Sequence, residues 1–377
     1  MFVFAVVFNL GWSSRVVTNT ARRTPPRTRS ISACTTTFAT TSVTVGGLEV
    51  PVCIWCPEPL FPQDAWQPAA AYNYVVDVGR IATKLKVGWL SWLPSRTRTL
   101  TRAIAPPSDS PVSASEPGDA LIFAHGFLGS PFDMAHVCEA LASDGFIVAS
   151  PEMPESLAAS YDAQDGVTRE AIVRATQQAI DASITTPTSS ARRWGIFGHS
   201  AGSGTALLQP GEFALGRICL ATALGRCLES RTDDPLFLVA SEGDGCNKRM
   251  MQNGAPSPED ALTLARVNGA PHFELFDCAE HAYGEQQMGR APPRRGVLYF
   301  REGSALVPNH ISFLWRGTNE AMFELLSLFL PLARALNLFL LDFDKEMEVR
   351  QAEPTAAKLV PAIRRFFGTF READHST

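Results

Sequence analysis

A serine flanked by glycines separates an apolar run from a run of small residues near the middle of the chain. The stretch reads Trp194-Gly-Ile-Phe-Gly-His-Ser-Ala-Gly-Ser-Gly-Thr-Ala-Leu-Leu208, which predicts a buried strand at 194–197 and a helix at 204–209. Strand, G-x-S-x-G and helix in this order are the context of a nucleophile elbow. Glycine is needed two residues on either side of the serine, because a side chain there would collide with the neighbouring strand or helix. Ser200 is therefore the candidate nucleophile, and the N-terminus of the following helix would favour negative charge beside it.

A serine nucleophile needs a base that removes its proton, and histidine is the usual one. His310 lies in Val307-Pro-Asn-His-Ile-Ser-Phe-Leu314, shortly after an apolar run at 296–301 that reads as a strand. A loop that follows a strand of a parallel sheet is well placed to present a base at the edge that holds the nucleophile. His310 is the candidate base, and His281, inside a polar insertion, is the alternative.

The base in turn needs an acid that orients it, and the acid should precede it in the chain. Asp244 ends Phe237-Leu-Val-Ala-Ser-Glu-Gly-Asp244, directly after a predicted strand and between two glycines. A turn-forming role beside glycine is the alternative interpretation of this aspartate. Glu242 and Asp277 are the other candidate acids.

Two backbone amides should stabilise the oxyanion that forms when the serine attacks an acyl group. One is expected from Ala201, directly after the nucleophile, and the other from Phe127, in the loop after the strand that ends at Ala124. His125 and His199 lie beside these positions, and a structural hydrogen-bonding role is expected for both.

The elements that must position these residues alternate between strand and helix. Antiparallel strands are expected early in the chain, then alternating strands and helices, then C-terminal helices: strands at 72–81, 96–102, 119–124, 146–150, 217–223, 235–240 and 296–301, and helices at 131–144, 167–184, 322–341 and 356–370. Alternation of this kind predicts an α/β fold with a mainly parallel central sheet and helices on both faces. The tryptophan-containing stretch 88–92 is expected to pack in the core, with an exposed apolar lip as the alternative.

The first 48 residues differ in composition from the rest. They hold five arginines and no Asp, Glu or Lys, are dense in Ser and Thr, and open with an apolar run at 2–10. This composition is typical of an organelle transit peptide, and the leading run resembles a signal-peptide core. The segment 1–48 is expected to be a targeting presequence, with a plastid as the destination, or else a disordered tail. Mitochondrial, secretory and cytoplasmic locations are the alternatives.

Bulk composition limits the classes of ligand. The net charge of −5 offers no basic surface for nucleic acid, and the apolar stretch at 322–341 carries Glu324 and Arg334 and a proline, so no transmembrane span is expected. Cys53-Ile-Trp-Cys56 is a lone C-x-x-C, expected to be ordinary thiols or a local disulfide. No metal and no cofactor are expected, and the expected partner is a small-molecule ester.

Four motifs together resemble the α/β-hydrolase superfamily: His-Gly-Phe at 125–127, Gly-His-Ser-Ala-Gly at 198–202, Gly-Asp-Gly at 243–245 and Asn-His-Ile-Ser-Phe at 309–313. The stretch 141–149 resembles the branch that holds platelet-activating-factor acetylhydrolases, chlorophyllases and dienelactone-hydrolase-like esterases. Chlorophyllases have Arg where this chain has Ala201, and both acetylhydrolases and chlorophyllases place the acid one strand earlier. The resemblance covers about 70–340, the expected catalytic core, within a single α/β-hydrolase domain at 49–377 with C-terminal helices after 318. No large lid domain is expected, because the connection from Leu224 to Pro235 is short.

The chemistry expected from these residues is hydrolysis of carboxylic esters through an acyl-enzyme on Ser200, with an apolar or lipid-like ester as substrate. An acyltransferase or thioesterase would use the same three residues. A non-catalytic ligand-binding protein of this fold is a further alternative, because fold alone does not fix function.

Overall fold

The computed structural model describes residues 35–102, 118–158, 167–184, 192–222, 232–246, 273–277, 293–301, 303–327 and 345–372, together with a few single residues between them. The strands are β1 Thr36–Val45, β2 Leu48–Pro57, β3 Gln67–Pro68, β4 Ala71–Asp77, β5 Ser95–Thr101, β6 Ala120–Ala124, β7 Ile147–Pro151, β8 Trp194–His199, β9 Gly216–Leu220, β10 Leu236–Ser241, β11 Glu274–Asp277 and β12 Arg295–Phe300. The helices are α1 Val78–Lys84, α2 Ala135–Ser143, α3 Arg169–Ser183, α4 Ala201–Leu208, α8 Arg316–Leu326 and α10 Lys345–Glu372, with short 3₁₀ helices η1 Glu58–Leu60 and η2 Gly88–Leu90.

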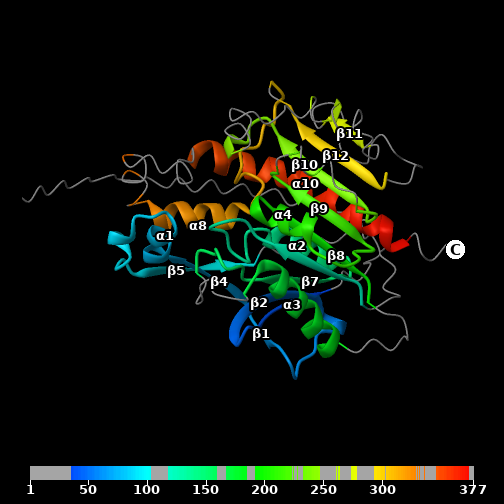
Figure 1. The fold of residues 1–377 in the computed structure, drawn as a ribbon, viewed down its shortest axis with the longest axis horizontal. Coiled ribbons are helices and arrows are strands. Elements are labelled where there is room, and N and C mark those ends of the chain that lie inside the picture. Colours follow the sequence, from blue (N-terminus) through cyan, green and yellow to red (C-terminus); the bar gives the residue numbers. More distant parts are fainter. Residues whose placement is uncertain are drawn as a thin grey trace, which may run out of the picture. The chain divides into compact units, whose positions relative to one another are not determined.

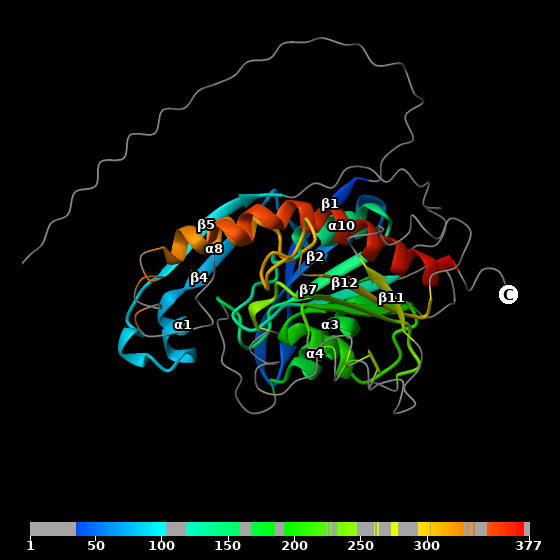
Figure 2. The same ribbon diagram turned by 90° about the horizontal axis from the view of Figure 1, so that it is seen from above.

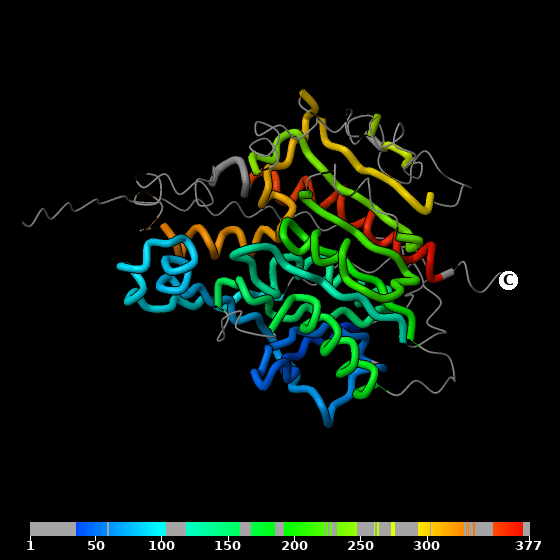
Figure 3. Tube along the Cα trace, in the orientation of Figure 1, coloured from blue at the N-terminus to red at the C-terminus, as the bar shows by residue number. Residues whose placement is uncertain are grey.

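Ten of these strands form one sheet in the order β11-β12-β10-β9-β8-β6-β7-β2-β1-β3. The pairs from β11 to β7 are parallel, whereas β2, β1 and β3 add antiparallel strands at the other edge. The first strands and the last strands along the chain therefore occupy opposite edges of the sheet (Figures 1 and 3). The prediction of a mainly parallel sheet is confirmed.

Helices cover both faces of this sheet, as Figure 2 shows with α10 on one side and α3 and α4 on the other. Side chains of α2, α8 and α10 pack in one apolar cluster, and those of α3 and α4 pack in a second cluster on the opposite face. Residues in the central strands β6 to β10 are buried almost without exception, because both faces of each strand are covered.

The predicted boundary of the N-terminal presequence is wrong. Residues Thr36–Val45 form β1, which pairs along its whole length with β2 and places Phe38, Ala39 and Val43 in the core. The dense Ser and Thr of this stretch suit a strand, because β-branched residues pack well on a pleated surface. Residues 1–34, which hold all five arginines of the segment, lie outside the described residues, so their targeting role stays a prediction.

The two early antiparallel strands pair as predicted, but they form a separate two-stranded sheet, β4–β5. The predicted strand at 72–81 is too long, because helix α1 begins at Val78. Asp77 caps that helix by accepting a hydrogen bond of 2.7 Å from the Arg80 amide. The β4–β5 sheet lies beside α8 in both ribbon views (Figures 1 and 2).

The cysteine pair at 53 and 56 lies within β2, where residues three apart point to opposite faces. Both cysteines are buried thiols outside any disulfide, so the expectation of ordinary thiols holds over that of a local disulfide. Among the described residues, no helix combines the length and the apolar character needed to cross a membrane.

Candidate active site

The turn that carries Ser200 is strained in the way a nucleophile elbow requires. Ser200 has a φ of 56° and a ψ of −120° between β8 and α4, a conformation that L side chains rarely adopt. Its amide donates to the Leu220 carbonyl at 2.9 Å, and the buried Ser203 hydroxyl donates to the same carbonyl at 2.6 Å. Strand β9 thus fixes the elbow from the side.

The two elbow glycines are required for the reason that the sequence predicts. A Cβ at Gly198 would lie 2.0 Å from the Gly202 carbonyl oxygen, and a Cβ at Gly202 would lie 1.8 Å from the Ala124 carbonyl oxygen. Both contacts are with backbone, which cannot move aside without displacing α4 or β6. The close approach of α4 to β6 therefore depends on these glycines.

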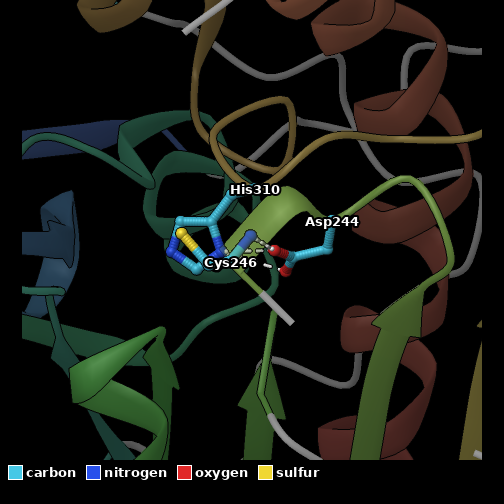
Figure 4. A group of neighbouring side chains, drawn as sticks. All are labelled: Asp244, Cys246 and His310. Carbon is cyan, nitrogen blue, oxygen red and sulfur yellow. Dashed lines mark hydrogen bonds and ion pairs between the residues drawn. The ribbon is translucent and has the colours of Figure 1, made fainter. Parts of the chain in front are cut away.

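Three of the predicted residues meet at the carboxyl ends of the parallel strands. His310, in the loop after β12, has its Nε2 2.9 Å from Ser200 Oγ, which lets the hydroxyl donate to a neutral imidazole. Its Nδ1 donates to both carboxylate oxygens of Asp244, at 2.9 and 3.0 Å. Asp244 is fully buried at the end of β10, and Figure 4 shows its carboxylate directed at the His310 ring.

The alternative acids and base lie elsewhere or outside the described residues. Glu242 bonds through its amide to the Phe300 carbonyl at 2.9 Å. Asp277 ends β11, which pairs with β12 at the outer edge of the sheet, away from β10. His281 lies outside the described residues. Within the part of the chain that is described, Asp244 is the proposed acid that bonds to the His310 ring.

The environment of His310 favours its protonated form. Burial lowers its pKa, but the charge of Asp244 and the hydrogen bond to it outweigh burial and raise the pKa to about 10. The ordinary value for histidine is near 6.5. An imidazolium formed here is therefore stabilised by the buried carboxylate, as it must be when the ring takes a proton from serine.

Both predicted oxyanion amides border the serine. Ala201 follows it at the start of α4, and the loop at 126–127 passes so close that a Cβ on Gly126 would lie 3.1 Å from Ser200 Cβ. Neither the Phe127 amide nor the Ala201 amide donates to another group in the described ranges of the chain. Two free amides beside a nucleophile can bind an oxyanion.

The other two histidines near the site hold backbone, as expected. His125 is buried, its Nδ1 donates to the Gly126 carbonyl at 2.9 Å, and its Nε2 accepts from the Met153 amide at 2.8 Å. His199 donates from Nε2 to the His310 carbonyl at 2.8 Å. Burial is the main cause that lowers the pKa of each ring to about 3, so both stay neutral.

A cavity of about 100 Å³ opens beside Ser200 and His310. Its walls are mostly apolar and come from β4, the loop after β6, the segment after His310, and α8; they include Tyr74, Leu128, Leu157, Leu314, Met322 and Leu326. The sequence predicted α8 only as a helix packing on the sheet. Its role as a wall depends on long-range packing that no local pattern encodes.

Two polar side chains of the cavity were not foreseen. Asp133 is buried, accepts a hydrogen bond of 3.0 Å from the Ser130 amide, and has its pKa raised to about 7, chiefly by burial. Cys246, two residues after Asp244, lies beside His310 (Figure 4). The sequence feature that indicated this cysteine was its place two residues after the predicted acid, in Gly243-Asp-Gly-Cys246.

Asp244, Cys246 and His310 each offer a potential metal-ligand atom, and these atoms lie within 4.8 Å of one another. Both ring nitrogens of His310 already take part in hydrogen bonds, one with Asp244 and one with Ser200. A cation bound here would have to displace one of those bonds. The side chains therefore fit a hydrogen-bonded relay better than a resident metal.

The mainly parallel sheet, the helices on both faces, and the serine elbow at the carboxyl ends of the strands define an α/β-hydrolase fold. No family model matches the chain, and no curated protein matches it in sequence. Similar solved structures include a ferulic acid esterase from Streptomyces cinnamoneus, with 20% identity, a TM-score of 0.32, and coverage of 63% of this chain and 71% of the esterase. A putative dienelactone hydrolase from Klebsiella pneumoniae has 11% identity, a TM-score of 0.36, and coverage of 73% of this chain and 88% of its own. An α/β serine hydrolase without a lid from Xanthomonas campestris has 14% identity, a TM-score of 0.35, and coverage of 73% and 86%.

Proposed function

We propose that the protein is a serine hydrolase of carboxylic esters, with Ser200, His310 and Asp244 as its catalytic residues. The observation that carries the proposal is the unbroken hydrogen-bonded chain from Ser200 Oγ through His310 to the buried Asp244, built on a strained serine. Nucleophile, base and orienting acid in this geometry can transfer an acyl group without any further reagent.

In the proposed reaction, His310 Nε2 takes the Ser200 proton as Oγ attacks the ester carbonyl. The oxyanion is held by the amides of Ala201 and Phe127, and each such donor lowers the barrier by about 2.7–4 kcal/mol. The imidazolium then protonates the leaving alcohol, and an acyl-serine remains. Water, deprotonated by His310, attacks that ester and releases the acid, while Asp244 keeps the Nδ1 proton in place.

The proposed substrate is an ester with an apolar acyl or alcohol part. The support is the lining of the cavity, in which leucines, a methionine and a tyrosine surround the serine, with Asp133 as a buried acidic group. Apolar walls favour an apolar group because its transfer from water is worth about 25 cal/mol per Å² of buried surface.

Fluorophosphonate labelling of the full chain beside Ser200→Ala is the direct test. The full chain is needed because removing residues before 49 would delete β1 from the sheet. We expect labelling and turnover of p-nitrophenyl esters in the wild type, and in the variant no labelling and a loss of kcat of about 10⁶-fold. A fold that melts normally but neither labels nor hydrolyses any ester would contradict the proposal.

The same ester assay determines which class of ester is cleaved and whether water or an alcohol accepts the acyl group. Esters of graded chain length should be hydrolysed more efficiently as the acyl chain grows, until it fills the cavity. Exclusive activity on charged short-chain esters would contradict the apolar assignment. Product analysis with an added alcohol, and with thioesters in parallel, separates hydrolysis from acyl transfer and thioester cleavage.

A further inference from the structure

Two tryptophans stand exposed on the segment between the paired strands β4 and β5. Trp89 and Trp92 have 65% and 74% of their surface accessible, the largest exposures among aromatic side chains in the described part of the chain. The expectation that stretch 88–92 packs in the core is therefore wrong. An indole is rarely left in water in this way without a function, because its burial is strongly favourable.

Backbone packing around the turn keeps Trp89 and Trp92 exposed. Helix α1 and η2 pack so closely that a Cβ on Gly79 would lie 2.2 Å from the Ser91 carbonyl oxygen. The Val87 amide donates to the Ala82 carbonyl at 2.8 Å, which closes the turn after α1. Leu85 and Leu93 pack against the core on either side of the indoles. The two leucines anchor the segment, and the two tryptophans are held outward.

The same segment is basic in an acidic protein. Residues 78–97 contain Arg80, Lys84, Lys86 and Arg96 and no Asp or Glu, while the whole chain has a net charge of −5. Lys86 is exposed, next to Val87 and the tryptophan turn. Indole rings flanked by lysine and arginine are the side chains that prefer the headgroup region of a membrane.

This segment is fastened to two walls of the cavity. Strand β4, which carries Tyr74 of the cavity, leads directly into α1, and the Asp77 amide donates to the carbonyl of cavity residue Leu157 at 2.8 Å. On the other side, Arg96 donates to the Leu325 carbonyl of α8 at 2.8 Å. A surface to which this segment binds would thus lie close to the cavity beside Ser200.

We propose that residues 78–97 dock the protein on a lipid bilayer that carries anionic headgroups. Trp89 and Trp92 would insert among the headgroups, and the exposed Lys86 would contact lipid phosphates. The docking rests on the exposed indoles and the local charge, and it stands whether or not the ester chemistry proposed above is correct.

Flotation with vesicles made of ether-linked lipids tests the docking apart from hydrolysis, because such lipids hold no carboxylic ester. Phosphatidylcholine vesicles are compared with vesicles in which a third of the lipid is phosphatidylglycerol. We expect the full chain to bind the anionic vesicles and to be released by high salt. The double variant Trp89→Ala/Trp92→Ala should bind about tenfold or more weakly, and Leu208→Ala, which trims an exposed leucine of α4, should bind as wild type.

The charge contribution is tested separately with Lys86→Gln. A lysine near an anionic surface strengthens binding about fivefold, so we expect a loss of about fivefold on anionic vesicles and little change on neutral ones. Far-UV circular dichroism and thermal melting of each variant control for folding. Two results would overturn the proposal: vesicle binding that the tryptophan variant retains, or a wild type that binds no anionic vesicles. In the second case, a wild-type dimer that the tryptophan variant abolishes would assign the segment to self-association.

Discussion

The elbow and the loop after β12 each bring a histidine to the site, and the two rings lie side by side with centroids 4.9 Å apart. Their environments differ in how each ring meets the buried carboxylate of Asp244. His310 is hydrogen-bonded to that carboxylate, which raises the pKa of the ring. Among the described residues His199 bonds to the His310 carbonyl instead, and burial is the main cause that lowers its pKa to about 3. Proximity to the serine therefore does not make a base. A carboxylate behind the ring does.

The comparison also separates two uses of the same side chain. His199 donates its Nε2 proton to the backbone carbonyl of His310, which positions that loop, and its lowered pKa keeps the ring uncharged at neutral pH. His310 has its Nε2 directed at Ser200 Oγ and its Nδ1 proton held by the acid. Variants that change the hydrogen bonds of each ring test the assignment of His310 as the base and of His199 as a positioning residue.

The largest difference is expected when each ring is removed in turn. His310→Ala should lower kcat for a soluble p-nitrophenyl ester by about 10⁶-fold, because Ser200 would lose the proposed base. Thermal melting of the variant serves as the folding control, since the ring is one side of a cavity. Comparable losses from His310→Ala and from a substitution at His199 would refute the division of roles between them.

Asp244→Asn should make His310 resemble His199. The amide can donate to Nδ1, which leaves the proton on Nε2 facing the serine, the wrong tautomer for a base. We expect kcat to fall by about 10⁴-fold with the fold intact. Glu242→Gln is the matched control, and its activity should stay near that of wild type.

The same variant predicts a shift in the pH profile. In the proposed mechanism neutral His310 is the active form, so we expect kcat/KM to fall as pH drops through the pKa of that ring. Asp244 is the main group that raises that pKa, which places the acid limb of wild type above pH 6.5. Without the carboxylate, the lowering effect of burial is less opposed, and the limb should move to lower pH. An acid limb that stays in place in Asp244→Asn would show that another group sets it.

The elbow and its partners could be predicted from sequence because each depends on local chemistry. Gly198, Ser200 and Gly202 form one contiguous turn, and Asp244 and His310 each follow a buried strand whose neighbours are obvious from their apolar runs. Parallel strands then bring their carboxyl ends together without further information. The order of the elements along the chain was enough to place these residues at one edge.

What could not be predicted depends on contacts between distant segments. Strand β1 shares its dense Ser and Thr with the Arg-containing residues before it, and its pairing with β2 and β3 makes it part of the sheet. The stretch 88–92 has the composition of core, and only the packing of α1 on η2 leaves Trp89 and Trp92 outside. In both places local composition competes with tertiary pairing, and tertiary pairing prevails.

The smallest effect expected comes from the bond between the two histidines. His199→Phe removes the donor to the His310 carbonyl, and a hydrogen bond of this kind is worth about 0.5–1.5 kcal/mol, so kcat should fall about two- to tenfold with little change in KM. His199→Gln can place an amide nitrogen where Nε2 lies, and it should recover most of the loss. If His199→Phe and His199→Gln both abolish turnover, or lose equal activity, then His199 has a role in the reaction beyond holding the loop of His310. If the loop alone is affected, the acid limb of kcat/KM should stay where His310 and Asp244 set it, because the carboxylate still faces the same ring.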